Sequence, residues 1–312
     1  MGICGFVLFI HRVLKLHFIS ANLSFQFRLT RYNGTRKPFL FKTQMFLHRC
    51  RVDFHRLVEQ CVDGAAIQMD RTSHTLPLSA VGEVEARTKM KEFWKENSKE
   101  ATVEEMMLDS QANELTQYEL PEILSILPCL RESNVLELGA GIGRYTSHLL
   151  TKAKHVTAVD FMESFVEKNR RNNGHHSNVT FIQSDVTKLE IPKNSIDLIF
   201  SNWLLMYLSN EELKTFMKKS LHWLRPGGFL FFRESCNHRS GDAKLECNPT
   251  FYRTDEDYNH LVSSVDIEEP EGGQKIGYKI VLKKKIQAYM KIKNNPNQVC
   301  WLLEKVSRSH DN

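Results

Sequence analysis

Short apolar runs alternate with amphipathic segments through the middle of the chain. The apolar runs lie at 134–139, 155–160, 178–182, 195–201 and 229–233, and the segments with helical spacing lie at 143–154, 162–173 and 210–224. Short apolar runs bounded by turn residues indicate buried strands, and a 3.6-residue spacing of apolar positions indicates amphipathic helices. Strands that alternate with helices over short connections predict a doubly wound, mostly parallel α/β sheet.

The last part of the pattern differs. Two strand-like runs, 279–291 and 298–305, are separated by the turn Asn294-Asn295-Pro296-Asn297, which predicts a terminal antiparallel hairpin. A mostly parallel sheet that ends in such a hairpin resembles the seven-stranded fold of the class I S-adenosylmethionine-dependent methyltransferases. Before the first strand, helices are predicted at 83–97 and 121–127, and Thr102 with Glu105 predicts a capping box.

Charge separates the N-terminal region from the rest. Residues 1–52 contain nine Lys or Arg and no Asp or Glu, so of the 42 basic and 37 acidic residues, 33 basic and 37 acidic remain for 53–312. We therefore expect residues 1–80 to be a poorly ordered extension and 81–308 to form the methyltransferase domain. The mild acidity of the second part argues against a nucleic-acid partner.

The cysteines and the apolar segments narrow the class of protein further. The seven cysteines contain no C-x-x-C pair, and no His/Cys/Asp cluster has metal-ligand spacing, so we expect reduced thiols and no metal site. The apolar run Ile3–Ile10 is too short to span a bilayer and is followed, not preceded, by basic residues. These features favour a cytoplasmic protein without stable membrane insertion.

A glycine loop follows the first predicted strand. It reads Glu137-Leu138-Gly139-Ala140-Gly141-Ile142-Gly143-Arg144. Glycines at Gly139 and Gly141 let the backbone turn sharply and approach a ligand closely. Glu137 precedes the first glycine and the third glycine of the dinucleotide pattern is absent, so the loop favours S-adenosylmethionine over NAD. Arg144 is a candidate partner for the cofactor carboxylate.

Polar residues also end the next three strands. Asp160 closes the second strand and can accept both ribose hydroxyls, whereas Asp185, with the backbone of Val186, can meet the adenine amine. Asn202 ends the fourth strand. In open parallel sheets, ligands bind at the carboxyl ends of the strands, so we expect these residues to share one cofactor site.

Several longer segments resemble a known family. They are Phe93–Ser98, Glu105–Ser110, Val135–Arg144, Asp197–Leu208 and Phe231–Cys236. Together they resemble the N-terminal catalytic half of the two-domain phosphoethanolamine N-methyltransferases, with a likeness that runs from about residue 90 to 306. The resemblance implies methyl transfer from S-adenosylmethionine to phosphoethanolamine, on the route to phosphocholine. It also implies phospho-N-methylethanolamine as the main product, with later methylations left to a second methyltransferase.

The resemblance also implies roles for particular residues. Tyr207 falls where single-domain relatives carry the histidine of a Tyr–His pair, so it either acts through water or orients the amine. Hydroxyl groups and guanidinium forks suit a phosphate dianion. The candidate phosphate-binding residues are Ser235, Ser240, Gly241 (through its backbone), Tyr252 and Arg253.

Three alternatives stay open from the sequence. One is a methyltransferase that acts on another small-molecule or lipid acceptor. The second is a non-catalytic methyltransferase-like partner subunit that binds the cofactor, against which the intact Gly139–Gly143 loop, Asp160 and Asp185 argue. The third is an NAD-dependent enzyme, which binding of nicotinamide without binding of S-adenosylhomocysteine would favour.

Overall fold

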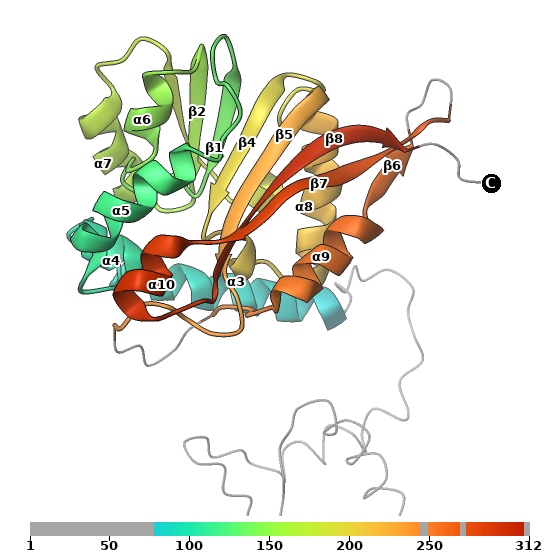
Figure 1. Ribbon diagram of the computed structural model, residues 1–312. Helices are drawn as coiled ribbons and strands as arrows, with labels where there is room; N and C mark the ends of the chain where they lie inside the picture. Colours follow the sequence, from blue (N-terminus) through green and yellow to red (C-terminus); the bar gives the residue numbers. More distant parts are fainter. Residues whose placement is uncertain (1–77, 244–248, 269–272, 309–312) are drawn as a thin grey trace, which may run out of the picture. The chain divides into compact units, whose positions relative to one another are not determined.

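One mixed sheet organises the part of the chain that the computed structural model describes, residues 78–243, 249–268 and 273–308. Its order is β3-β2-β1-β4-β5-β8-β7-β6 (Figure 1). The parallel strands are β1 Asn134–Leu138, β2 His155–Asp160, β3 Val179–Gln183, β4 Ile196–Asn202 and β5 Leu224–Ser235. The antiparallel strands are β6 Asp266–Glu268, β7 Lys275–Lys285 and β8 Gln298–Arg308. The predicted fold class is confirmed, and the short β6 adds an eighth strand at the edge.

Helices cover both faces of this sheet. They are α3 Leu78–Glu96, α4 Val103–Met107, α5 Ala112–Leu124, α6 Thr146–Leu150, α7 Glu163–Asn173, α8 Asn210–Trp223, α9 Asp255–Ser264 and α10 Gln287–Lys293. Two 3-10 turns, η3 Val186–Lys188 and η4 Leu205–Tyr207, follow β3 and β4. The expectation of an extension at 1–80 falls almost entirely on residues outside the described part of the chain.

The core has two halves because successive strand residues point to opposite faces. On one face, Phe200 and Phe231 stack with ring centroids 5.0 Å apart and pack against residues of α5, α6 and α10. On the other face, Phe232 and Trp301 stack at 4.7 Å and pack against residues of α8 and α9. The buried aromatic pairs therefore fix the register of β4, β5 and β8 from both sides.

Local differences from the sequence expectations concern single elements. Thr102 accepts the backbone N–H of Glu105 as predicted, but the Glu105 carboxylate accepts the N–H of Glu100, so the capping box is only half formed. Pro121 lies inside α5 instead of starting a helix. The predicted strand 279–291 ends at Lys285, and its remainder forms α10, whose Tyr289 is buried among the α5 side of the core.

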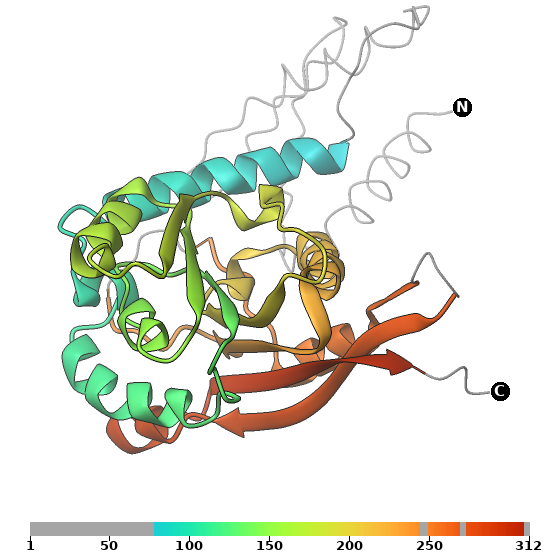
Figure 2. The ribbon, with the colours of Figure 1, turned by 90° about the horizontal axis from the view of Figure 1, so that it is seen from above.

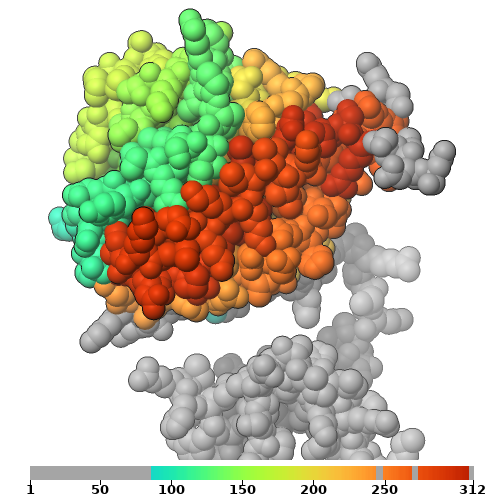
Figure 3. Space-filling model, viewed as in Figure 1, coloured from blue at the N-terminus to red at the C-terminus, as the bar shows by residue number. Residues whose placement is uncertain are grey.

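The strand β7, the helix α10 and the strand β8 form a band across one face of the described unit, as Figure 3 shows in red. Near the carboxyl ends of the parallel strands, α3 runs along one side of the described unit (Figures 1 and 2). The predicted cofactor residues lie at this end of the sheet. No helix in the described ranges is both long and apolar enough to cross a membrane.

Candidate functional site

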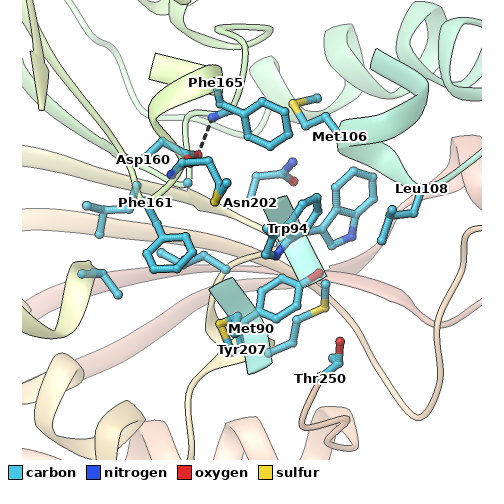
Figure 4. Close-up of a pocket in the computed structure, with 18 of the residues that line it drawn as sticks. Met90, Trp94, Met106, Leu108, Asp160, Phe161, Phe165, Asn202, Tyr207 and Thr250 are labelled. Atoms are coloured by element: carbon cyan, nitrogen blue, oxygen red, sulfur yellow. Dashed lines mark hydrogen bonds between the residues drawn. The ribbon is translucent and has the colours of Figure 1, made fainter. Parts of the chain in front are cut away.

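A pocket opens at the carboxyl ends of the parallel strands, between those ends and the helices α3 and α4 (Figure 4). It is lined by the predicted residues Gly139, Gly141, Asp160, Asp185, Val186, Asn202, Tyr207, Ser235, Ser240, Gly241 and Tyr252. Three predicted residues, Glu137, Arg144 and Arg253, are not among its lining. The two predicted halves of the site, for a cofactor and for a phosphorylated acceptor, therefore lie in one pocket.

The glycine loop is tied to the end of β2. One carboxylate oxygen of Asp160 accepts the backbone N–H of Gly141 at 2.8 Å, and the other accepts the N–H of Met162 at 2.8 Å. Gly141 has φ +55°, and a Cβ there would meet the Met106 side chain of α4. Burial raises the pKa of Asp160 above its ordinary value, although the backbone N–H groups lower it. Asp160 thus shapes the loop as well as lining the pocket.

Glu137 lies behind the pocket wall. It is buried, and its carboxyl accepts the Thr146 hydroxyl at 2.6 Å, which in turn accepts the side-chain amide of Asn169 at 2.9 Å. Burial raises the pKa of Glu137 to about 8, against the lowering effect of the Thr146 hydrogen bond. This chain of bonds connects β1 to α6 and α7, so Glu137 holds the helices that follow the loop.

At the end of β3, Asp185 caps η3 by accepting the backbone N–H of Thr187 at 2.9 Å. Arg87 of α3, which the sequence analysis missed, lies 3.8 Å from the Asp185 carboxylate and 2.6 Å from that of Glu212. Arg87 also lines the pocket. It therefore attaches α3 to the strand-end region through two carboxylates.

Arg144 points into a buried ionic cluster. Its guanidinium pairs with the Glu119 carboxylate of α5, and the other Glu119 oxygen accepts Arg233 Nη2 at 2.6 Å. Arg233 Nη1 donates to Asn202 Oδ1 at 3.0 Å, which fixes that amide at the pocket wall. Burial alone would raise the pKa of Glu119, but Arg233 and Arg144 hold it below its usual value. Two guanidinium groups therefore share one carboxylate in the core.

Trp203 has backbone φ +54°, a left-handed conformation that is rare for a large side chain and that often marks functional sites. The backbone N–H of Trp203 donates to the Arg233 carbonyl at 2.8 Å, and the Arg233 guanidinium lies 3.6 Å from the centroid of the indole ring. One face of this indole is thus already covered by a cation.

The 3-10 turn η4 is held from both ends. At its start, the buried Glu234 carboxylate accepts the N–H groups of Leu205 at 2.8 Å and Met206 at 3.2 Å. Arg253 donates to the carbonyls of Leu205 at 3.3 Å and Leu208 at 2.6 Å. The guanidinium predicted to bind phosphate is therefore buried against the backbone of η4 and positions that turn. Burial raises the pKa of Glu234 to about 7.

Tyr207 lies at the acceptor end of the pocket with Thr250, whereas Asp160 and Phe161 lie at the opposite side (Figure 4). Burial raises the pKa of Tyr207 above its ordinary value, and a hydrogen bond with Thr250 lowers it. At neutral pH the phenol is therefore uncharged. Its ring contacts Trp94 of α3 edge-on, with centroids 5.8 Å apart.

The segment after β5 supplies polar groups at the same end. The hydroxyl oxygens of Ser235 and Ser240 lie 3.1 Å apart, and Arg239 lines the pocket beside them. A Cβ at Gly241 would meet the carbonyl of Leu108, so the loop packs directly on the end of α4. Arg239, unlike Arg253, therefore lines the pocket, and its guanidinium donates to the carbonyl of Ala243 at 2.8 Å.

Apolar residues from α3 and α4 close the remaining wall. Met90 and Trp94 of α3 and Met106 of α4 line the pocket with Phe161 and Phe165 (Figure 4). Helical spacing identified α3 as a helix but did not show which side faces a ligand. A cue lay in the sequence, because Trp94 lies in a segment that resembles the family.

Comparisons with known proteins show what the chain is similar to. Residues 135–228 match the model of a methyltransferase domain. Phosphoethanolamine N-methyltransferase 3 of Arabidopsis thaliana is 49% identical over 229 residues, which cover 73% of this chain and 46% of that protein. Phosphoethanolamine N-methyltransferase 1 of Triticum aestivum is 47% identical over 240 residues, covering 76% and 48%.

A solved structure is similar as well. Haemonchus contortus phosphoethanolamine N-methyltransferase 1, in complex with phosphoethanolamine and S-adenosylhomocysteine, has a TM-score of 0.70 and 34% identity, covering 73% of this chain and 50% of that one. This chain spans about half the length of the curated relatives it matches. By its sequence and its fold, the chain is an S-adenosylmethionine-dependent methyltransferase domain that is similar to one half of the phosphoethanolamine N-methyltransferases.

Proposed function

We propose that this chain is an enzyme that transfers a methyl group from S-adenosylmethionine to the amine of phosphoethanolamine. One observation carries the proposal: a single pocket is lined by a glycine loop and strand-end carboxylates and also by Ser235, Ser240, Tyr252 and Arg239. The names of the relatives, and the two ligands of the Haemonchus contortus structure, support the same pair of substrates.

The cofactor is assigned to the side of β1, β2 and β3. Gly139 and Gly141 let the backbone approach it, and Asp160 keeps a free lone pair on each oxygen for the ribose hydroxyls. Asp185 with the Val186 backbone faces the adenine, and Asn202 lies at the methionine end. Glu137 and Arg144, behind the wall, hold that wall in place instead of touching the cofactor.

The acceptor is assigned to the opposite side. Ser235, Ser240 and Tyr252 offer hydroxyl groups to the phosphate, Gly241 offers its backbone N–H, and Arg239 offers the charge. Charge-assisted hydrogen bonds from such donors suit a dianion. Free ethanolamine lacks the phosphate, so it forgoes these bonds.

The reaction needs a neutral amine, because the nitrogen lone pair must attack the methyl carbon. A free alkylamine has a pKa of about 10, so it arrives protonated and loses the proton to water. The carbon–sulfur bond then breaks, its electron pair stays on sulfur, and S-adenosylhomocysteine leaves. Tyr207 is uncharged at neutral pH, so its oxygen accepts an N–H of the amine and aligns the lone pair.

Methylation stops at phospho-N-methylethanolamine in this proposal, and a second methyltransferase in the cytoplasm continues to phosphocholine. The resemblance to one half of two-domain relatives supports this division of labour. Mass analysis of the products from phosphoethanolamine tests it directly. Substantial dimethylated or trimethylated product from the purified chain would contradict the single-step assignment.

The central test compares acceptors. With S-adenosylmethionine present, phosphoethanolamine should be methylated and ethanolamine should not, as followed by formation of S-adenosylhomocysteine. Equal turnover of both amines would remove the phosphate site from the proposal. Binding of S-adenosylhomocysteine by calorimetry, without turnover of any phosphobase, would show a non-catalytic partner instead.

A further inference from the structure

Gln298 lies behind the two serines of the acceptor side and has no role in the proposal above. It is the first residue of β8, and its register partner on β5 is Ser235. Its side chain is fully buried. A buried amide must satisfy both its donors and its acceptor, so its hydrogen bonds show how it is oriented.

Trp203 sets that orientation. The indole N–H can only donate, and it donates to Gln298 Oε1 at 2.8 Å. The amide nitrogen must therefore face the opposite way, toward the serines. Gln298 Nε2 lies 2.6 Å from the hydroxyl oxygen of Ser235 and 2.6 Å from that of Ser240. Both serine oxygens thus act as acceptors toward Gln298.

This arrangement decides where the serine hydrogens point. Each hydroxyl carries one hydrogen, and neither hydrogen can be donated to an N–H group that is itself a donor. The two oxygens are 3.1 Å apart, so one hydrogen can bridge them. At least one other is left to be donated into the pocket, which both serines line.

We infer that Gln298 is a positioning residue that turns the Ser235 and Ser240 hydroxyls into donors for the phosphate of the acceptor substrate. The inference rests on the proposed function, because it assigns a phosphate to this end of the pocket. An ionised phosphate oxygen only accepts hydrogen bonds, so hydroxyls oriented as donors favour it over an ammonium or another donor group.

The variant Gln298→Glu tests this orientation with almost no change in shape. A carboxylate accepts hydrogen bonds, so it draws the serine hydrogens away from the pocket while still accepting the Trp203 N–H. We expect the KM for phosphoethanolamine to rise at least about tenfold, the loss of one charge-assisted bond. The affinity for S-adenosylhomocysteine, measured by calorimetry, should stay within about twofold. Gln117→Glu, exposed on α5, is the matched control and should leave both values unchanged.

Two further variants distinguish an effect on the orientation of the serine hydroxyls from a disturbed local structure around residue 298. Gln298→Met removes the donor without reversing it, so its KM should lie between those of wild type and Gln298→Glu. Ser240→Ala should cost less in the Gln298→Glu background than in the wild type, because that hydroxyl no longer faces the phosphate. Additive effects would overturn the inference, because coupled residues are expected to be non-additive.

The outcomes also distinguish this inference from the proposed function. If wild type neither methylates phosphoethanolamine nor binds phosphocholine as a probe, the proposed function fails. If wild type methylates phosphoethanolamine but Gln298→Glu keeps its KM, only the role of Gln298 fails. A Gln298→Glu variant that also loses S-adenosylhomocysteine binding would show a structural role for Gln298. In that case the KM of Gln298→Met decides between a structural role and a positioning role.

Discussion

The two sides of the pocket are built in different ways. On the side assigned to the cofactor, Asp160 at the end of β2 accepts the N–H of Met162, two residues on, and that of Gly141, 19 residues before it. On the acceptor side, the pocket residues depend on partners far along the chain, such as Gln298 for Ser235 and Arg253 for η4. The first side follows largely from the neighbouring ends of β1 and β2, whereas the second exists only once β5, β8 and the 250–253 segment are assembled.

Each side also hides one buried carboxyl group behind its wall. Glu137 supports the glycine loop through Thr146, and Glu234 supports η4 through backbone N–H groups. Burial raises the pKa of both, to about 8 and about 7 respectively. The two sides differ, however, in how far along the chain their supporting partners lie. We therefore expect the cofactor side to tolerate changes in distant segments that disable the acceptor side.

The largest effect is expected at Asp160. The variant Asp160→Asn keeps one accepting oxygen for two backbone N–H groups and offers an N–H where the ribose needs an acceptor. We expect about 100-fold weaker binding of S-adenosylhomocysteine by calorimetry, the loss of two hydrogen bonds to a charged group. Asp266→Asn on β6 is the control. Unchanged affinity would show that the cofactor lies elsewhere.

Arg253 should have the next largest effect, and on the other side. The variant Arg253→Lys keeps the charge but cannot reach several carbonyls at once. We expect about a 30-fold lower kcat/KM for phosphoethanolamine, the cost of one or two lost charged hydrogen bonds. Binding of S-adenosylhomocysteine should not change, and Arg225→Lys serves as the exposed control. An equal loss of kcat/KM for phosphoethanolamine and of affinity for S-adenosylhomocysteine would contradict the contrast between the two sides of the pocket.

Tyr207→Phe removes one hydroxyl and leaves the ring that packs on Trp94. Because an uncharged hydrogen bond is lost, we expect kcat to fall about tenfold with the KM for S-adenosylmethionine unchanged. Steady-state kinetics with both substrates varied measures the two effects. Tyr118→Phe, exposed on α5, is the matched control. A rise in the cofactor KM alone would place Tyr207 on the wrong side of the pocket.

The last prediction concerns the pH dependence of folding stability and not the affinity for a ligand. The folded protein holds the Glu137 proton more tightly than the unfolded chain does, so the stability from this group is present below pH 4.5 and is lost as pH rises to about 8. The slope from one proton is at most about 1.4 kcal/mol per pH unit. The free energy of unfolding is measured in urea at several pH values. Glu137→Gln should remove the fall of this free energy with pH up to about pH 8, and Glu234→Gln should remove a fall that ends at about pH 7.

The fold class predicted from the sequence is confirmed, and the predicted strand-end residues Asp160, Asp185 and Asn202 line one pocket, because the alternation of strands and helices brings the strand ends to one edge of the sheet. The sequence also suggested Arg253 for the phosphate, although the structure buries its side chain against the η4 backbone, and Arg239 lines the pocket instead. The residues 286–291 read as strand because they continue an apolar and basic pattern, but packing against α5 makes them helical. Gln298 could not be found from the sequence, since its role depends on pairing between β5 and β8.

The ionic cluster of Glu119, Arg144 and Arg233 constrains how relatives of this chain can diverge. Removal of Glu119 alone would leave two buried cations facing each other, and neither arginine can shed its charge by titration. Substitutions in α5, in the glycine loop and in β5 must therefore occur together or be compensated. A chimera that takes only one of these segments from a relative whose cluster differs should contain an unpaired buried charge and be destabilised. A chimera that takes all three segments should fold.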